Sequence, residues 1–231
     1  LLIFYPSLRI YLAAKIAGIK NIKIYNLLRK KNLHLIKAAK KLTEDFLNIK
    51  NCPTETNFFI KKEKLEKVYQ ELEPNKFRIV IGAGSSGPTT RWGAEKFSKL
   101  INKLNTLDDY FFFILCGPNE KEIEDKIVSN LVMKNYLTLS NKNIGNLIPY
   151  LCAADMYVGN DSFGSHITSQ SGKKSIIMLL DAPKAYTDYS DNYYRMVPNG
   201  FDIKEITHGT NADPNLISVE EVIKTITQLK N

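Results

Sequence analysis

Cysteine is scarce in this 231-residue sequence, and the few cysteines form no recognisable pattern. Cys52, Cys116 and Cys152 are far apart, odd in number and without C-x-x-C spacing. This argues against a disulfide framework or a zinc site and is typical of reduced, cytosolic thiols. Cys116 and Cys152 stand in apolar runs, so we expect them in the core. No spacing of His, Asp and Glu resembles a metal site either.

Long apolar runs are also missing. Residues 1–20 are mostly apolar, but Arg9 and Lys15 interrupt them, whereas a membrane-spanning helix needs roughly 20 apolar residues. The segment lacks the small-residue cleavage site of a signal peptide. Because it also lacks an initiator Met, we expect the chain to start inside a larger protein.

Positive charge exceeds negative charge. The 32 Lys and Arg residues against 24 Asp and Glu residues give a formal net charge of +8. A basic balance favours anionic partners such as phosphate, nucleic acid or a membrane surface, although a Lys- and Asn-rich genome gives the same excess. No basic run is interleaved with aromatic residues, so we expect no nucleic-acid partner.

Several catalytic motifs are absent as well. The loop "GAGSSGPTTRW" at residues 82–92 is neither G-x-G-x-x-G nor a Walker loop, because no G-K-[ST] is present. A P-loop kinase or ATPase is therefore not expected. The nucleophile elbow G-x-S-x-G is missing too, which argues against a Ser-His-Asp hydrolase of that type.

Short, unbroken apolar runs alternate with helical segments from Phe77 onward. The runs predict strands at residues 77–82, 110–116, 137–139, 155–159 and 174–180. This alternation predicts a parallel sheet that helices cover on both faces, and Asn119 has the position to cap one of the helices. Residues 182–213 have no period and predict a long surface excursion. Ser218 and Glu221 then have the spacing of a capping box.

The residues before this region predict a smaller set of elements. They are a helix at 7–17, a strand at 19–25, a second helix at 33–47 and a connector at 48–60. Gly18 ends the first helix, and a charged helix that follows the connector ends before Pro74.

Three loops follow predicted strands and should therefore lie at one edge of the sheet: "GAGSSGPTTRW", "GPNE" and "GNDSFGSH". In an open parallel sheet, ligands bind outside the carboxyl ends of the strands. Glycines let the backbone approach a ligand closely, and the helix N-termini that follow offer N–H groups to phosphate. Each loop alone is equally well explained as a tight turn. Three such loops at one edge favour an anion or nucleotide site.

Several side chains of these loops suit an anionic ligand. Hydroxyl donors and a permanent cation stand in the first loop: Ser85, Ser86, Thr89, Thr90 and Arg91. Trp92 either packs at the base of the following helix or stacks on a base. His166, five residues after Asp161, either meets it at one ligand or only hydrogen-bonds within its helix. His34 and His208 have no such neighbours, and we regard them as incidental.

Three segments together resemble the C-terminal half of glycosyltransferase family 9, the heptosyltransferases of lipopolysaccharide core synthesis. They are "GAGSSGPTTRWGAEKFSKL", "ILCGPNEKE" and "IGNLIPYLCAADMYVGNDSFGSHITSQSGKKSIIML", within residues 75–181. The family has a Gly-Ala-Ser loop, Lys-Arg-Trp-Pro, a Gly-x-x-x-Glu segment and an Asp-Thr-Gly-Pro-x-His-Leu-Ala loop in this order. The stretch "YPSLRIYLAAKIAGIKNIKIYN" also resembles the later part of that family's first domain.

The resemblance implies an α/β, GT-B-like fold, with a Rossmann-like C-terminal domain built on a parallel sheet and a partial N-terminal α/β domain. The implied boundaries are 1–60 for the partial acceptor-side domain, 61–74 for a linker helix, 75–215 for the nucleotide-sugar-binding domain and 216–231 for a C-terminal helix. It also implies transfer of heptose or a related sugar from an ADP-sugar to a lipid-anchored, lipopolysaccharide-type glycan. No metal or other cofactor is implied, and the protein would be cytoplasmic, with peripheral contact at the inner membrane.

Donor-binding residues are implied by the same resemblance. They are Ser85, Ser86 and Thr90 at the diphosphate with Arg91 beside them, Glu120 at the ribose hydroxyls, and Asp161, Ser162, Phe163 and Gly164 at the phosphate and sugar with His166 close behind.

The sequence departs from the family pattern in several places. Thr90 replaces the Lys before Arg-Trp, which leaves Arg91 as the substitute cation, and no Pro follows Trp92. Phe163 stands where the family has Gly, which adds bulk and restricts φ. The N-terminal Gly-Asp region that supplies the family's catalytic Asp has no counterpart, so the catalytic residue is unknown. The sequence thus leaves open a transferase fragment, a non-catalytic nucleotide-sugar-binding module or an epimerase on the same fold.

Overall fold

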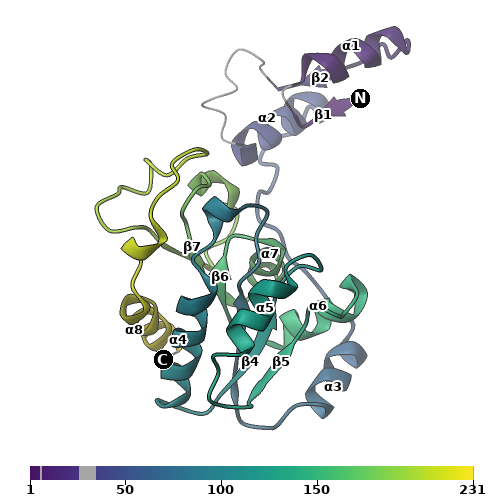
Figure 1. Ribbon diagram of the computed structural model, residues 1–231. Helices are drawn as coiled ribbons and strands as arrows, with labels where there is room; N and C mark the ends of the chain where they lie inside the picture. The colour runs from purple at the N-terminus through teal and green to yellow at the C-terminus, as the bar shows by residue number, and fades with distance from the viewer. Residues whose placement is uncertain (6, 26–34, 231) are drawn as a thin grey trace. The chain divides into compact units, whose positions relative to one another are not determined.

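The computed structural model describes residues 1–5, 7–25 and 35–230, which form two compact units, Leu1–Thr56 and Asn57–Asn231 (Figure 1). In the first unit, β1 (Leu2–Ile3) pairs in parallel with β2 (Lys23–Ile24), and α1 (Leu8–Ile16) connects them. The Ser7 hydroxyl caps α1 by accepting the Ile10 N–H at 3.4 Å. Gly18, at φ 77°, follows α1 where the sequence predicted its end.

The second helix of this unit is α2 (Leu35–Leu47), and residues 48–60 form neither helix nor strand, as predicted. The predicted start of α2 at residue 33 lies outside the described residues, as does His34. No described helix is both long enough and apolar enough to cross a membrane.

Six parallel strands form the centre of the second unit. They are β3 (Phe77–Gly82), β4 (Tyr110–Leu115), β5 (Tyr136–Thr138), β6 (Met156–Asn160), β7 (Lys174–Met178) and β8 (Tyr193–Met196). Their order in the sheet is β5-β4-β3-β6-β7-β8. From β3 the chain adds β4 and β5 on one side, and then crosses back to add β6, β7 and β8 on the other side of β3. In doubly wound sheets a ligand site lies at such a reversal.

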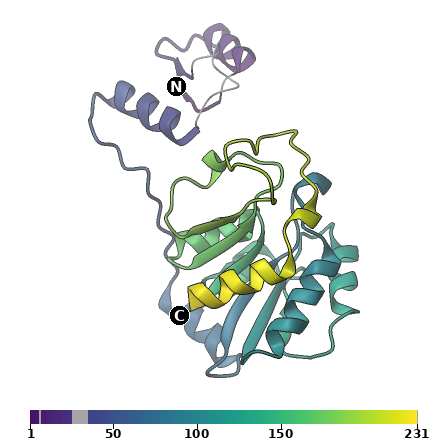
Figure 2. The same ribbon diagram turned by 90° about the vertical axis from the view of Figure 1, so that its left-hand side faces the viewer.

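Helices cover both faces of this sheet, so the prediction of a parallel sheet buried on both sides is confirmed. One face carries α4 (Ala94–Asn105), α5 (Lys121–Val128) and α8 (Val219–Lys230), and Figure 2 shows α8 lying along it. The other carries α3 (Lys62–Gln70), α6 (Ile144–Ala153) and α7 (Phe163–Gln170). The helices α3 and α8 thus pack within the second unit, α3 through the buried Val68 and α8 through the buried Val222. Ser218 and Glu221 form the predicted capping box.

Two predictions are wrong. Residues 182–213 are not only a surface excursion, because β8 pairs with β7 and Tyr193 and Ile206 are buried. The short 3-10 helix Lys184–Tyr186 and the polar residues around β8 hide this edge strand from a search for periodicity. Asn119 does not cap α5, which instead begins after Glu120. No side chain caps this helix, because the Glu120 carboxylate turns back toward the loops at the sheet edge.

Candidate functional site

A pocket of about 750 Å³ opens at the carboxyl edge of the sheet, around the reversal between β3 and β6. Four loops line it, together with the ends of the strands and helices that flank them. The lining residues are Gly84, Ser85 and Ser86 after β3; Leu115 at the end of β4 and Cys116, Gly117, Pro118 and Glu120 after it; Leu139, Ser140, Lys142, Asn143, Ile144 and Leu147 after β5; and Asp161, Ser162, Phe163 and Gly164 after β6. The three loops singled out in the sequence therefore converge on one hollow.

A pair of glycines lets β3 and β6 carry a large buried side chain to this edge. Gly82 and Gly159 are register partners, and a Cβ on Gly159 would lie 2.3 Å from the Gly82 carbonyl oxygen. A Cβ on Gly82 would lie 1.8 Å from the Tyr157 hydroxyl. That hydroxyl donates to the Asn160 carbonyl at 2.7 Å and lies 3.0 Å from the Ser162 Oγ. Tyr157 therefore holds the backbone that enters the loop after β6.

Asn160 joins the loop after β3 to the end of β6, a role that the sequence did not reveal. Its Nδ2 donates to the Ala83 carbonyl at 2.7 Å, and its Oδ1 accepts the Trp92 N–H at 2.9 Å. The side chain is fully buried, so these bonds replace the water that an amide would otherwise need. An Asn at the end of an otherwise apolar strand was the available signal. Trp92 is itself buried and donates its Nε1–H to the Ile217 carbonyl, so it packs in the core and does not stack on a base.

Glu120 holds the loops after β3 and β4 together. Its Oε1 accepts the Ser85 N–H at 3.0 Å and Nη2 of Arg91 at 2.7 Å, while Oε2 accepts the Gly117 N–H at 2.7 Å. A Cβ on Gly84 would lie 2.0 Å from Oε2, so the loop closes over the carboxylate only with glycine there. The charge of Arg91 is thereby paired inside the protein.

Thr90 and Arg91 do not line the pocket, and their side chains instead hydrogen-bond to the backbone of the loop after β3. The Thr90 hydroxyl donates to the Gly87 carbonyl at 2.9 Å and lies 2.7 Å from the Ser85 Oγ. Arg91 also donates to the Ser85 carbonyl at 3.3 Å. Both side chains therefore fix the shape of the loop that presents Ser85 and Ser86.

Asp161 lines the pocket with a largely buried carboxylate, and burial raises its pKa. The nearby His166 and a hydrogen bond from the Ser165 hydroxyl at 3.4 Å oppose this rise. Nε2 of His166 lies 3.5 Å from Asp161 Oδ1, so the two residues do meet, although His166 does not itself line the pocket. Its other ring nitrogen faces tyrosine hydroxyls from the segment around β8.

The loop after β5 contributes residues that the sequence did not single out. Lys142 lies there with Nζ 4.6 Å from the centre of the Tyr150 ring, and it is the only Lys or Arg among the described residues that line the pocket. Asn143 caps α6 by accepting the Asn146 N–H at 3.0 Å. With three residues, β5 is too short to mark the following "SNKN" as a site loop.

Phe163 is the first residue of α7, and this pocket-lining residue is 45% exposed. Ile144, at the start of α6, is also exposed and lines the same pocket. The site thus combines an apolar wall with backbone N–H groups at the start of α7, which an α-helix leaves without internal acceptors. Cys116 supplies no nucleophile here, because burial raises the pKa of its thiol to about 12.

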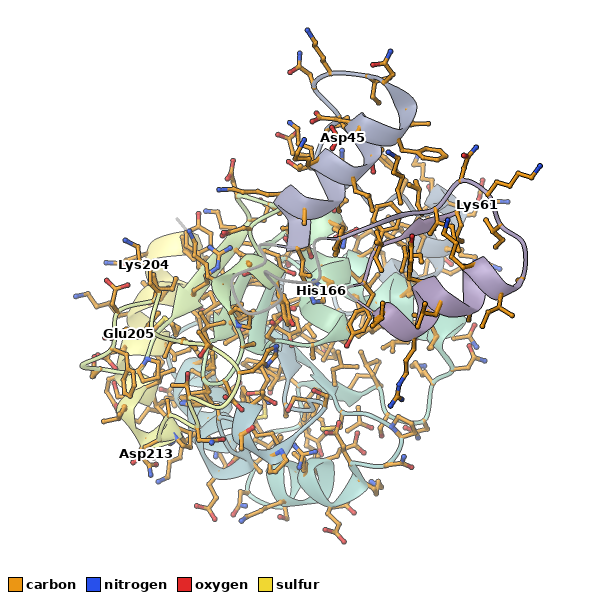
Figure 3. All side chains as sticks on the ribbon, turned by 90° about the horizontal axis from the view of Figure 1, so that it is seen from above. Asp45, Lys61, His166, Lys204, Glu205 and Asp213 are labelled. Carbon is orange, nitrogen blue, oxygen red and sulfur yellow. The ribbon has the colours of Figure 1, made fainter. Side chains whose placement is uncertain are left out.

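The described residues contain no group of three or more His, Cys, Asp or Glu side chains arranged to hold a metal ion. Viewed from above (Figure 3), His166 lies over the middle of the second unit, whereas Lys204, Glu205 and Asp213 lie at its periphery. His208 pairs with the Tyr186 hydroxyl at 2.7 Å, away from the pocket-lining residues.

Residues 15–193 match the model of "Glycosyltransferase family 9 (heptosyltransferase)". The chain belongs to glycosyltransferase family 9. No curated protein sequence matches it.

Three solved structures share the fold of this family 9 chain. The glycosyl transferase family 9 protein of Veillonella parvula has a TM-score of 0.75 at 19% identity, over 92% of this chain and 64% of its own. The ADP-heptose lps heptosyltransferase II of E. coli has a TM-score of 0.71 at 14% identity, over 99% and 74%. The E. coli heptosyltransferase WaaC with ADP has a TM-score of 0.64 at 15% identity, over 86% and 57%. The family 9 chain therefore spans less than two thirds of the first and third of these proteins, and its predicted α/β, GT-B-like class is confirmed.

Proposed function

We propose that this chain forms the donor-binding part of a glycosyltransferase that moves heptose or a related sugar from an ADP-sugar to a lipopolysaccharide-type glycan. The observation that carries the proposal is the pocket at the β3/β6 reversal, where four loops converge. Membership in glycosyltransferase family 9 and the fold shared with a heptosyltransferase whose structure contains ADP support it.

The pocket wall divides into parts that suit the parts of a nucleotide sugar. The exposed Ile144, backed by the buried Leu139 and Leu147, forms an apolar surface on which the flat face of a base packs. The N–H groups of Phe163 and Gly164, at the positive end of α7, donate hydrogen bonds to the diphosphate. Asp161, next to this turn, is placed to accept sugar hydroxyls.

Charge in the pocket is arranged so that a diphosphate is tolerated. The negative charge of Glu120 is offset by the guanidinium of Arg91. Lys142 adds a cation on the far wall. During transfer the same N–H groups stabilise the charge that develops on the departing ADP, which is the usual electrostatic contribution to such a step.

The base, the remaining donor contacts and the acceptor complete the proposal. A base must take the proton of the attacking acceptor hydroxyl, and we assign no residue of this chain to that role. We propose Ser85, Ser86 and Glu120 as donor contacts, with Thr90, Arg91 and His166 as their supports. The acceptor is a lipid-anchored glycan, which the protein reaches from the cytoplasmic side by peripheral contact with the inner membrane. The transfer takes place without a metal ion.

Calorimetry with ADP tests this assignment. Ile144→Asp places a carboxylate on the apolar wall, at a helix start where an acidic residue favours the fold. We expect it to weaken ADP binding about tenfold, equivalent to ~1.4 kcal/mol. Val132→Asp is the matched control, because Val132 is equally apolar, highly exposed and outside the pocket.

The proposal is contradicted if the wild-type protein does not bind ADP at millimolar concentration. It is also contradicted if Ile144→Asp and Val132→Asp lose ADP affinity equally. Binding of ADP without sugar transfer, even when the acceptor glycan is supplied, would indicate a non-catalytic nucleotide-sugar-binding module. The exposed Phe163 at the sugar side of the pocket is the observation that favours this second function.

A further inference from the structure

A polar network lies behind Asp161, between α7 and the segment around β8. His166 on α7 has its Nδ1 at 2.5 Å from the Tyr189 hydroxyl and 2.9 Å from the Tyr193 hydroxyl. The two hydroxyls are 2.8 Å apart, and Gln170 donates to Tyr189 at 3.4 Å. The pocket-lining Asp161 therefore touches an imidazole whose other nitrogen is held by two phenols.

The donors and acceptors of this network bear on which imidazole nitrogen of His166 carries the proton. A neutral imidazole has one nitrogen that donates and one that accepts. Burial raises the pKa of both Tyr189 and Tyr193, so both hydroxyls keep a proton to donate. In one arrangement that satisfies every group, Tyr189 donates to Nδ1 and accepts from Tyr193 and from Gln170, which uses both of its lone pairs. Nδ1 is then the acceptor, and Nε2 carries the proton that faces Asp161 Oδ1.

The rings hold this geometry independently of the hydroxyls. The His166 and Tyr189 rings are stacked, with centroids 5.9 Å apart and planes at 24°. Tyr193 meets both rings edge-on and is buried. Because a phenylalanine at either position keeps the ring contacts, the hydrogen-bonding role can be separated from the packing role.

We propose that Tyr189 and Tyr193 are positioning residues that fix the Nε2–H tautomer of His166 and, through it, the orientation of the Asp161 carboxylate in the donor pocket. The inference rests on the proposed function, because Asp161 matters here as a contact of the donor sugar. Ser165 and His166 hold the carboxylate from α7, and the charge of Arg195 on β8 acts on it as well. The segment after β7 thus takes part in donor recognition although it lines no part of the pocket.

The test uses Tyr189→Phe and Tyr193→Phe, singly and together, with Tyr186→Phe as the matched control. Tyr186 also pairs its hydroxyl with a histidine, His208, but neither of these two residues lines the pocket. Proton–nitrogen correlation spectra of the imidazoles report the tautomer of His166. Calorimetry then compares the affinity for ADP with that for an ADP-sugar.

We expect His166 in the wild type and in the control to be the Nε2–H tautomer, and the double variant to show a mixture with Nδ1–H. We also expect the double variant to bind the ADP-sugar about tenfold more weakly while ADP affinity changes less than twofold, because only the sugar meets Asp161. An Nδ1–H tautomer in the wild type, an unchanged tautomer in the double variant, or equal losses for ADP and ADP-sugar would each overturn the inference. If the wild type binds no ADP, the proposed function fails, and the tautomer alone still decides whether the tyrosines position His166.

Discussion

The two edges of the six-stranded sheet both carry a hollow, of about 750 Å³ at the carboxyl edge and about 620 Å³ at the amino edge. At the carboxyl edge, the buried side chain of Asn160 and the partly buried side chain of Glu120 bind the backbone of the surrounding loops. At the amino edge, Lys230 pairs with Asp108, and Asp155 accepts a backbone N–H. Because the two hollows are similar in volume, the charge and hydrogen bonding of their lining residues must distinguish a ligand site from a structural surface.

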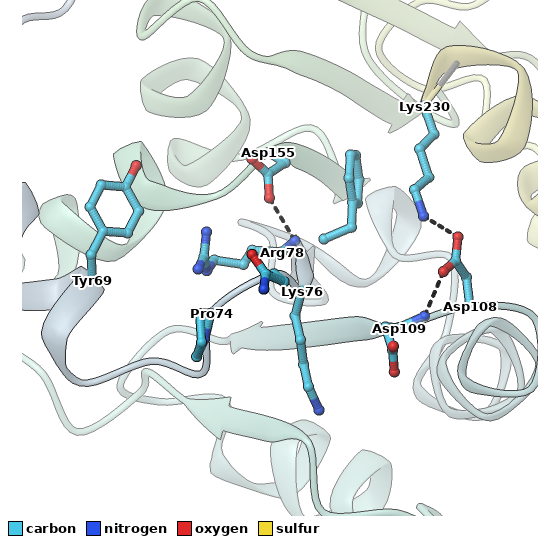
Figure 4. Close-up of a pocket in the computed structure, with 10 residues that line it drawn as sticks. Tyr69, Pro74, Lys76, Arg78, Asp108, Asp109, Asp155 and Lys230 are labelled. Atoms are coloured by element: carbon cyan, nitrogen blue, oxygen red, sulfur yellow. Dashed lines mark hydrogen bonds and ion pairs between the residues drawn. The ribbon is translucent and has the colours of Figure 1, made fainter.

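Figure 4 shows the amino-edge hollow. Asp155 Oδ2 accepts the Arg78 N–H at 2.8 Å, and Lys230 pairs with Asp108. Lys230 also lies 4.6 Å from the centre of the Tyr110 ring. These contacts join the C-terminal end of α8 to the starts of the strands. The lining holds three basic side chains, Lys76, Arg78 and Lys230, against three acidic ones, Asp108, Asp109 and Asp155, so it offers an anionic ligand no excess of positive charge. We therefore assign this edge a structural role.

The largest effect that separates the two edges is expected at Gly84. Gly84→Ala places a methyl group against Glu120 Oε2 and the Gly117 N–H, 2.0 Å and 3.1 Å away, and should lower the free energy of unfolding by about 2 kcal/mol. ADP binding should fall with it, because the loops after β3 and β4 must separate. Chemical denaturation and calorimetry measure the two effects.

Gly87→Ala is the control, because Gly87 lies in the same loop and nothing is within 4 Å of its added Cβ. Equal loss of stability in both variants would show that the loop tolerates no side chain anywhere, and that the contact with Glu120 is not the cause.

A smaller effect, confined to stability, is expected at the amino edge. Asp155→Ala removes the acceptor of the Arg78 N–H and should lower the free energy of unfolding by about 1 kcal/mol. ADP affinity should stay within twofold of the wild type, since no ligand is assigned to this hollow. A tenfold loss of ADP affinity at unchanged stability would reverse the assignment of the two edges.

The smallest effect is expected from Asp161→Asn, and it depends on pH. The pKa of Asp161 is raised in the folded protein, so its protonated form is favoured by folding. Wild-type stability therefore falls as pH rises from about 3.8, the ordinary value, through the raised pKa. An amide does not titrate, so at pH 7 the variant should melt about 2 °C above the wild type, and the difference should vanish below pH 3.8.

Asp191→Asn, at an exposed position, is the control for this measurement and should show no such difference. A variant that melts below the wild type at pH 7 would mean that the interaction with His166 outweighs the burial of the carboxylate. ADP-sugar affinity should fall in Asp161→Asn even where stability rises.

The strands and helices of the second unit were predictable because local patterns report them. An unbroken apolar run such as residues 110–116 is typical of a strand with both faces buried, and β4 forms there. The edge strand β8 was missed because an edge strand needs fewer apolar residues and its neighbours are Asp, Asn and Pro. The loop after β5 was missed for a related reason, since a strand of three residues leaves little signal.

For the site residues, the sequence predicted the position of the loops but not the partners of their side chains. The loops that hold Ser85, Glu120 and Asp161 follow predicted strands, so their convergence at one edge was predictable from the direction of the chain. The partners of these residues were not predictable. Thr90 and Arg91 were expected to line the ligand site, but Thr90 hydrogen-bonds to the Gly87 carbonyl and Arg91 to the Glu120 carboxylate.

The sequence by itself determined the order of strands and helices, the family resemblance and the loops that carry polar residues, because these depend on neighbours along the chain. Only the tertiary structure decided which loops meet. Asn160 bonds to Ala83, 77 residues earlier, only because β6 returns to pair with β3. His166 likewise meets Tyr189 and Tyr193 only because β8 adds to the edge beside β7. Such bonds depend on the order of the strands in the sheet, which is set by pairing between segments far apart in the chain and which no local pattern specifies.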